Sequence, residues 1–204
     1  VVTYRLEGGY LSSPRWGHGL RRGRIRGEVV NVYSADEIKN MSAEELVERV
    51  NADIYENAFE RQKKQPCKYI GKAPAVGIER VLYVCPKCHK IGTIKSKGDM
   101  LFCSCGLEAT YNKYGFLEGN DLHYSTIDKW NEWQTQYMAD LVDSDSVFVK
   151  DDHQELFTLD KDHSLTLIDT GCLSTDGKEL VFEERHFPFD KIKMSTIRKQ
   201  DIVF

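Results

Sequence analysis

Four of the six cysteines stand in two close pairs, and their spacing constrains the fold of this chain more than any other feature. Cys85 and Cys88 form a C-x2-C pair, and Cys103 and Cys105 form a C-x-C pair. Each pair can present two sulfurs from one tight turn to the same ion, and Zn²⁺ favours four thiolates in a tetrahedral arrangement. The sequence therefore predicts a zinc site formed by these four cysteines.

The fourteen residues between the two pairs predict a β-hairpin. Apolar and β-branched residues, among them Ile94 and Leu101, flank a turn at Lys97-Gly98-Asp99. A hairpin with a cysteine pair at each end is typical of a zinc ribbon. Disulfide bonds or four separate buried thiols would be other interpretations, but the spacing favours zinc. His89 is expected to be a neighbour of the ion, because four cysteines already complete its ligand set.

The chain's size and cysteine usage narrow its class. Its 204 residues, 41% of them apolar, suffice for one domain or two small ones with modest cores. No apolar run approaches the roughly 18 residues needed to cross a bilayer, and no signal peptide is recognised. Cys67 and Cys172 stand alone, so a reducing cytoplasm is the expected location. Because Met41 is the first methionine, we expect a piece of a longer reading frame or a processed product.

Charge is distributed unevenly along the chain. Residues 60–97 contain ten Lys/Arg against two Glu, a net of +8, and residues 140–204 contain eight Lys/Arg against fifteen Asp/Glu, a net of -7. The basic stretch could face nucleic acid, a lipid headgroup or phosphate, and the acidic stretch would repel each of them.

Five further arginines lie close together near the N-terminus. Arginine binds phosphate with two parallel hydrogen bonds, so these residues are candidate anion ligands. A solvated loop flank is an equally good interpretation, and both stay open. The five are Arg15, Arg21, Arg22, Arg24 and Arg26.

The pattern of helices and strands predicts an α+β fold. N-terminal strands are expected at residues 1–6 and 28–33, and a helix begins after Ser42, with Glu45 completing a capping box, and ends at Pro66. Strands at 81–84 and 109–111 lead into and out of the zinc ribbon. A second helix, capped by Ser125 or Thr126, runs from 127 to about 142.

The C-terminal part predicts a small antiparallel β-meander. Short apolar segments separated by turn residues occur at 147–149, 156–159, 165–168, 180–183 and 202–204. The expected domains are residues 1–78 with the first strands and helix, 79–120 with the zinc ribbon, and 121–204 with the second helix and the meander.

Catalytic motifs are scarce. The chain has no glycine-rich phosphate loop in a suitable context and no G-x-S-x-G motif. His123 and Asp128 have the H-x4-D spacing of acyltransferases that deprotonate a hydroxyl. Asp128, however, falls in the first turn of the second helix, where an acidic side chain has a structural reason. We interpret this spacing as a coincidence and assign no catalytic residue.

Three segments resemble one enzyme family. They are residues 5–16 (RLEGGYLSSPRW), 79–88 (ERVLYVCPKC) and 114–119 (YGFLEG). Together they are similar to the C-terminal half of bacterial 1-acylglycerol-3-phosphate acyltransferases that carry a zinc ribbon after the acyltransferase domain. The similarity is strongest over residues 5–33 and 79–119 and weak in the meander. The proline common in the family's last block is missing from residues 1–4.

The resemblance implies the non-catalytic, accessory end of an enzyme of phospholipid biosynthesis. Members of the family move an acyl group from acyl-CoA or acyl carrier protein to lysophosphatidate at the membrane surface. Their catalytic residues lie in blocks upstream of the equivalent of Val1, so none transfers to this chain. The implied partners are an anionic lipid headgroup or acyl carrier protein, with peripheral association at the cytoplasmic face of the membrane.

A stand-alone zinc-ribbon module that binds nucleic acid or protein is the alternative function. The ribbon and the basic stretch 60–97 allow it. The only obvious side chains for base stacking nearby are Tyr111 and Tyr114, and the acidic C-terminal part opposes a polyanion. Nucleic acid is therefore the less favoured partner.

Overall fold

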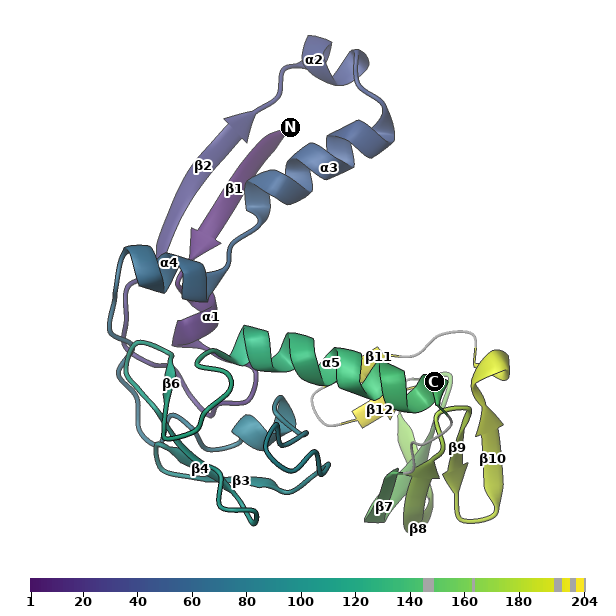
Figure 1. Cartoon of the computed structure of the whole chain (residues 1–204). Helices are drawn as coiled ribbons and strands as arrows, with labels where there is room; N and C mark the ends of the chain where they lie inside the picture. The colour runs from purple at the N-terminus through teal and green to yellow at the C-terminus, as the bar shows by residue number, and fades with distance from the viewer. Residues whose placement is uncertain (145–148, 163, 193–195, 199–200, 204) are drawn as a thin grey trace. The chain divides into compact units, whose positions relative to one another are not determined.

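The computed structural model has the predicted α+β fold (Figure 1). It describes residues 1–144, 149–162, 164–192, 196–198 and 201–203. The chain divides into two compact units, Val1–Gln134 and Thr135–Phe204. The predicted segments 1–78 and 79–120 both lie in the first unit, so the cysteine ribbon shares a unit with the N-terminal elements.

An antiparallel pair of strands opens the first unit. β1 (Val2–Glu7) pairs with β2 (Arg26–Val32), close to the predicted ranges, and α3 (Ala43–Ile54) runs beside them (Figure 1). Asp53 of α3 ties the layers together, because its carboxylate accepts hydrogen bonds from the hydroxyls of Thr3 (2.9 Å) and Tyr33 (2.7 Å). Two short helices, α1 (Gly9–Ser12) and α2 (Ala35–Lys39), were not predicted.

The single helix expected from Ser42 to Pro66 is two helices. α3 ends at Ile54, and α4 begins anew at Ala58 and runs to Lys64. Asn57 causes the restart, since its side-chain oxygen accepts the amides of Phe59 (2.9 Å) and Glu60 (3.1 Å) as an N-cap.

The predicted capping box is only half present at α3. The hydroxyl of Ser42 accepts the Glu45 amide at 3.1 Å, but the Glu45 carboxylate pairs with Arg49. A complete capping box instead starts α2, between Ser34 and Glu37.

The ribbon is a four-stranded antiparallel sheet in the order β3-β4-β5-β6. Its strands are β3 (Ile94–Lys97), β4 (Met100–Cys103), β5 (Glu108–Tyr111) and β6 (Leu117–Glu118). The expected hairpin is confirmed, with Ile94 opposite Cys103 and Lys97 opposite Met100. The strand predicted at 81–84 is wrong: a 3-10 turn, η1 (Ile78–Arg80), precedes a segment whose only ladder contact is the bridge between Val84 and Ile91.

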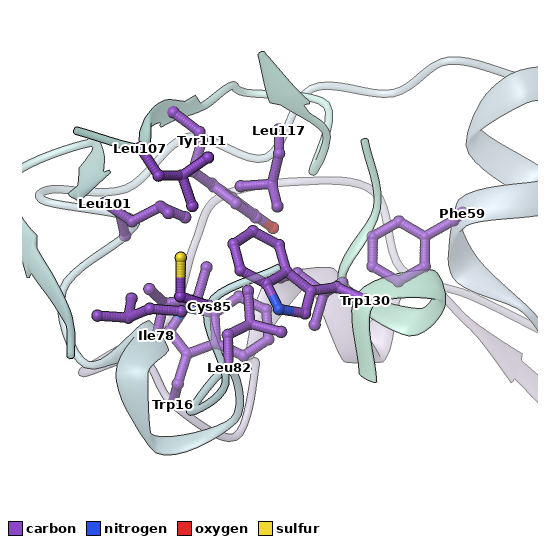
Figure 2. Packing of buried hydrophobic residues seen from close by; sticks show 14 of the residues in the cluster. Trp16, Phe59, Ile78, Leu82, Cys85, Leu101, Leu107, Tyr111, Leu117 and Trp130 are labelled. Carbon is purple, nitrogen blue, oxygen red and sulfur yellow. The ribbon is translucent and has the colours of Figure 1, made fainter. Parts of the chain in front are cut away.

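One hydrophobic core joins the ribbon to the N-terminal segments. Figure 2 shows Trp130 of α5 (Ile127–Asp143) among side chains from the ribbon and from η1. Trp16 and Trp130 are both fully buried. The other labelled members come from segments far apart in the sequence: Phe59, Ile78, Leu82, Cys85, Leu101, Leu107, Tyr111 and Leu117.

The second unit contains the predicted antiparallel meander. Its strands follow in the order β7 (Val149–Leu159), β8 (Leu165–Thr175), β9 (Glu179–Phe182) and β10 (Arg185–Pro188), and a separate hairpin pairs β11 (Thr196–Arg198) with β12 (Asp201–Val203). β7 and β8 extend well beyond the predicted segments 156–159 and 165–168, and β10 was not predicted. Residues 147–148 and 204 of the predicted strands lie outside the described residues. In the described part of the chain, no helix is long and apolar enough to span a bilayer.

Candidate metal centre

The four predicted ligands converge on one point. The sulfur atoms of Cys85, Cys88, Cys103 and Cys105 all lie within 4.8 Å of one another. The Cys85–Cys105 and Cys88–Cys103 sulfur distances are 3.6 and 3.8 Å. Disulfide sulfurs lie about 2.05 Å apart, whereas thiolates about 2.3 Å from a tetrahedral ion lie about 3.8 Å from each other. The spacing fits a metal ion bound by four sulfurs.

Two hydrogen-bonded turns of different length present the sulfurs. In the first, the His89 amide donates to the Cys85 carbonyl at 2.8 Å, and in the second the Gly106 amide donates to the Cys103 carbonyl at 3.0 Å. The turn residues His89 and Gly106 have φ of 59° and 84°, in the left-handed region. Such turns aim the cysteine side chains inward while the backbone reverses. The C-x-C pair therefore sits in a shorter turn, closed between residues three positions apart (103 and 106), than the C-x2-C pair, whose turn closes between residues four positions apart (85 and 89).

The thiols differ in their readiness to ionise. Burial raises the pKa of Cys85 to about 12. Burial also opposes ionisation of Cys103, but hydrogen bonds from the Cys105 amide and the nearby Thr93 hydroxyl outweigh it and lower the pKa of that thiol to about 6. Thr93 Oγ1 lies 3.2 Å from the Cys103 sulfur. A metal ion entering the site would displace the proton from Cys85 and meet a thiolate at Cys103.

Buried polar side chains support the loop that leads into the first turn. Gln134, fully buried in α5, accepts the backbone amides of Tyr83 (3.1 Å) and Val84 (3.3 Å) and donates to the Val81 carbonyl at 2.6 Å. The indole N–H of Trp130 donates to the Val84 carbonyl at 2.9 Å. These bonds replace the ladder of the strand expected at 81–84 and place Cys85 in the core.

The second helix thus contributes to the site in a way that sequence reasoning missed. That helix carries an apolar stripe at helical spacing, and Trp130, which belongs to the stripe, is fully buried in the core. Gln134 lies one turn further along the same face. Its position on the stripe was the available signal, but a lone glutamine on a helix is usually exposed.

His89 is not among the four clustered ligands. It is exposed, and its ring lies 5.7 Å from that of Trp133. Four thiols leave a tetrahedral ion no open position for a substrate. The arrangement suits a structural metal site rather than a catalytic one. Cys67 and Cys172 belong to other parts of the fold: Cys67 follows α4, and Cys172 lies in β8.

The five candidate anion ligands are not all alike. Arg21 is 7% exposed, and its guanidinium donates to the Tyr111 hydroxyl and the Pro74 carbonyl. The other four are exposed: Arg15, Arg22, Arg24 and Arg26. The structure therefore does not bring the five together as one exposed cluster, and Arg21 is part of the core's edge.

His123 and Asp128 form no catalytic pair among the described side chains. His123 is exposed beside Tyr124, with ring centroids 6.4 Å apart, and the Asp128 carboxylate accepts from the Asn57 amide group at 3.0 Å. Asp128 thus links the start of α5 to the start of α4, as a structural role would require.

Comparisons with protein-family models, with curated proteins and with solved structures found no match to this chain.

Proposed function

We propose that the four-cysteine site holds zinc and that the ion is structural. All four donors are thiols, which suit Zn²⁺, and their separations suit tetrahedral coordination. The binding energy of such an ion is folding energy, because the site does not exist in the unfolded chain. Metal analysis of the purified protein tests this, with one zinc per chain as the expected result. A site filled by iron, or by no metal, would contradict it.

We further propose that this chain is the non-catalytic, zinc-ribbon-bearing region of a 1-acylglycerol-3-phosphate acyltransferase. The observation that carries the proposal is that the three segments with the family resemblance pack into one core. Leu11, from the first segment, and Leu82, from the second, share that core. Gly115, from the third, lies so close to Leu11 that an added Cβ would be 2.8 Å from the leucine methyl.

In this function the region takes no part in the acyl transfer itself and instead assists the parent enzyme. The ribbon positions the parent enzyme at the cytoplasmic face of the membrane, with an anionic lipid headgroup or acyl carrier protein as partner. The supporting observation is the net charge of +8 over residues 60–97. Five of the ten basic residues there lie in the ribbon segment 79–120: Arg80, Lys87, Lys90, Lys95 and Lys97.

The coding frame upstream of Val1, together with the activity of its full-length product, tests this assignment. We expect an H-x4-D block and an E-G-T-R block in that frame, and acylation of lysophosphatidate by the purified product. Changing His to Ala in the H-x4-D block should abolish turnover and leave the zinc content unchanged. A frame without these blocks, or a full-length product that does not acylate lysophosphatidate, would remove the proposal.

One observation favours a second candidate, a nucleic-acid-binding ribbon. On the exposed face of the β3–β4 hairpin, Lys95 lies opposite Phe102 and Lys97 opposite Met100, an arrangement that combines charge with stacking surface. Glu108, opposite Phe102 on the other side, counts against it. A gel-shift titration with single-stranded RNA and DNA decides: no binding at low salt excludes this function.

A further inference from the structure

A buried arginine without a carboxylate partner borders a pocket in the first unit. Arg21 is 7% exposed and always charged. Its guanidinium donates to the Tyr111 hydroxyl at 2.9 Å and to the Pro74 carbonyl, and both acceptors are neutral. Burial raises the pKa of Tyr111, so this phenol stays protonated. Among the residues that the structure describes, no Asp or Glu forms an ion pair with Arg21.

Aromatic rings compensate part of this charge. The guanidinium carbon lies 5.4 Å from the ring centre of Trp16 and 4.8 Å from that of Tyr111. Cation–π contacts of this kind stabilise a guanidinium that has lost its water. A buried ion normally needs an opposite charge as well, because its desolvation costs several kcal/mol. The positive charge of Arg21 is therefore only partly compensated within the protein, and an anionic partner would complete the compensation.

The pocket beside Arg21 is open to such a partner. Its volume is about 220 Å³, and it lies between two loops whose backbones are joined by mutual hydrogen bonds of Arg22 and Ile70 (2.8 and 2.9 Å). Every lining residue is neutral or basic: Gly17, His18, Leu20, Arg21, Gly71, Lys72, Ala73 and Pro74. His18 and Lys72 are exposed at the rim.

Two glycines lie against the Arg21 side chain. A Cβ at Gly71 would lie 2.9 Å from Arg21 Cγ, and a Cβ at Gly17 would lie 3.6 Å from Arg21 Nη2. The second distance also places the Nη2 group at the pocket wall formed by Gly17. With side chains at these positions, the approach to the arginine would be narrowed.

We propose that this pocket binds a phosphoryl group, with Arg21 as the buried anchor and Lys72 and His18 as rim ligands. Arginine's planar donors match phosphate oxygens, and a second cation suits a dianion. The pocket is smaller than the roughly 300–1,000 Å³ of sites for drug-sized ligands, so it takes the phosphoryl group and little more. Phosphoryl binding at this site does not depend on the acyltransferase assignment.

Titration of the full chain with inorganic phosphate tests the site. Saturable NMR shifts of the Gly17, Gly71 and Lys72 amides are expected, and acetate should produce weaker ones. Lys72→Ala should weaken phosphate binding by about fivefold, the size of an exposed charge pair. The matched control Lys64→Ala removes the same charge outside the pocket and should leave binding unchanged.

Arg21→Lys tests the anchor while keeping its charge. It should weaken phosphate binding more than Lys72→Ala does, because the two-pronged donor is lost. A variant spectrum that departs from the native one away from the pocket would mark a folding defect, and the Lys72→Ala result then decides alone. No shifts at the pocket amides, equal binding of acetate, or equal weakening by Lys64→Ala would each overturn the proposal.

A second arm separates the sources of the phosphoryl group. Vesicles of phosphatidylcholine with and without phosphatidic acid are floated with the protein. Binding that needs phosphatidic acid, needs Lys72 and is displaced by inorganic phosphate supports a lipid headgroup at this site. Phosphate binding without vesicle binding supports a soluble phosphorylated molecule. Vesicle binding that is unchanged by phosphate and by Lys72→Ala, with no phosphate shifts, overturns the site.

Discussion

Gln134 is a single side chain on which the metal-bearing loop depends. It pairs with three backbone groups, of Val81, Tyr83 and Val84, in a fully buried position. Gln134→Ala would leave these groups without partners, so we expect a loss of about 2–4 kcal/mol of unfolding free energy. Urea denaturation monitored by tryptophan fluorescence measures it.

The matched control is Gln136→Ala in the same helix. Gln136 is exposed, and its side chain donates to the Asp140 carboxylate one turn away, at 2.8 Å. Its loss should cost no more than about 0.5 kcal/mol. Equal effects of the two substitutions would show that the buried hydrogen bonds at Gln134 do not hold the loop.

The ligand set can be checked one cysteine at a time. Cys88→Ser and Cys103→Ser should each abolish stoichiometric metal binding and melt the ribbon, because a missing thiolate leaves the ion incompletely coordinated. Metal content by mass spectrometry and amide exchange of residues 94–111 report the two effects. Cys67→Ser, outside the cluster, should change neither. Unchanged zinc in both ligand variants would refute the set.

Metal affinity should rise with pH. The pKa of Cys85 is raised to about 12 by burial, so this thiol carries a proton throughout the range from pH 6 to 8 and must release it on binding. The logarithm of the association constant should therefore increase by at least about one per pH unit. Competition with a chromophoric chelator measures the slope, and a flat profile would be inconsistent with a protonated Cys85.

At the scale of residues, the sequence was informative where spacing is tied to chemistry. The four cysteines were predicted as one metal site because two close pairs of thiols can bind the same ion. Gln134 and Arg21 were not predicted as interior residues, since polar side chains are mostly exposed. Residues far away in the sequence bury them, and the local sequence does not indicate such contacts. Arg21 becomes buried only through Trp16, Pro74 and Tyr111.

At the scale of elements, the break between α3 and α4 rests on Asn57. Its side chain caps α4 and also donates to Asp128 at the start of α5. Asn57→Ala should destabilise the first unit by about 1–2 kcal/mol, the usual range for a lost N-cap. Asn51→Ala, at an exposed position within α3, is the control and should be neutral or slightly stabilising.

Thermal unfolding followed by circular dichroism compares the two asparagine variants. A midpoint for Asn57→Ala at or above that of the native protein would show that α3 and α4 tolerate fusion into one helix. The result would then favour the helix expected from the apolar periodicity.

Element types were predicted better than element limits. The hairpin and α5 were found because apolar periodicity and turn residues agree there. The helix after Ser42 was predicted too long, because the apolar periodicity of the sequence continues past Asn57. In the structure the helix is interrupted there, since Asn57 caps the next helix. The strand at 81–84 was wrong because β-branched residues also suit a buried irregular segment whose backbone is bonded by side chains.

At the scale of the whole molecule, the metal should matter to one unit only. All four cysteines of the site and the core around them lie in Val1–Gln134. Removing the ion with a strong chelator should abolish amide protection in the ribbon and around Trp130. Residues 149–159 and 165–175, a paired hairpin of the second unit, should keep theirs.

Hydrogen exchange of the full chain, with and without chelator, measures this difference. Addition of zinc should restore the lost protection. Equal loss of protection in both units would mean that the two units unfold together and are not independently stable.

The sequence did not predict which helices and strands share a compact unit. Three consecutive domains were expected, with the ribbon as a separate middle domain. Instead, residues 1–78 and the ribbon share a core, as Leu11 and Leu117 illustrate. Partners this far apart are chosen by packing, which leaves no signature in local composition.

The shared core also has a consequence for the order of events at the ribosome. Arg21 and Tyr111 are 90 positions apart, and Trp16 is covered by the same late segment. At about 5–20 residues per second, the early segment emerges roughly 5–20 s before its partner is made. Newly synthesised chains would thus expose Leu11 and Trp16 during this interval. Chaperones would be needed most then, and metal supply only once Cys105 has left the exit tunnel.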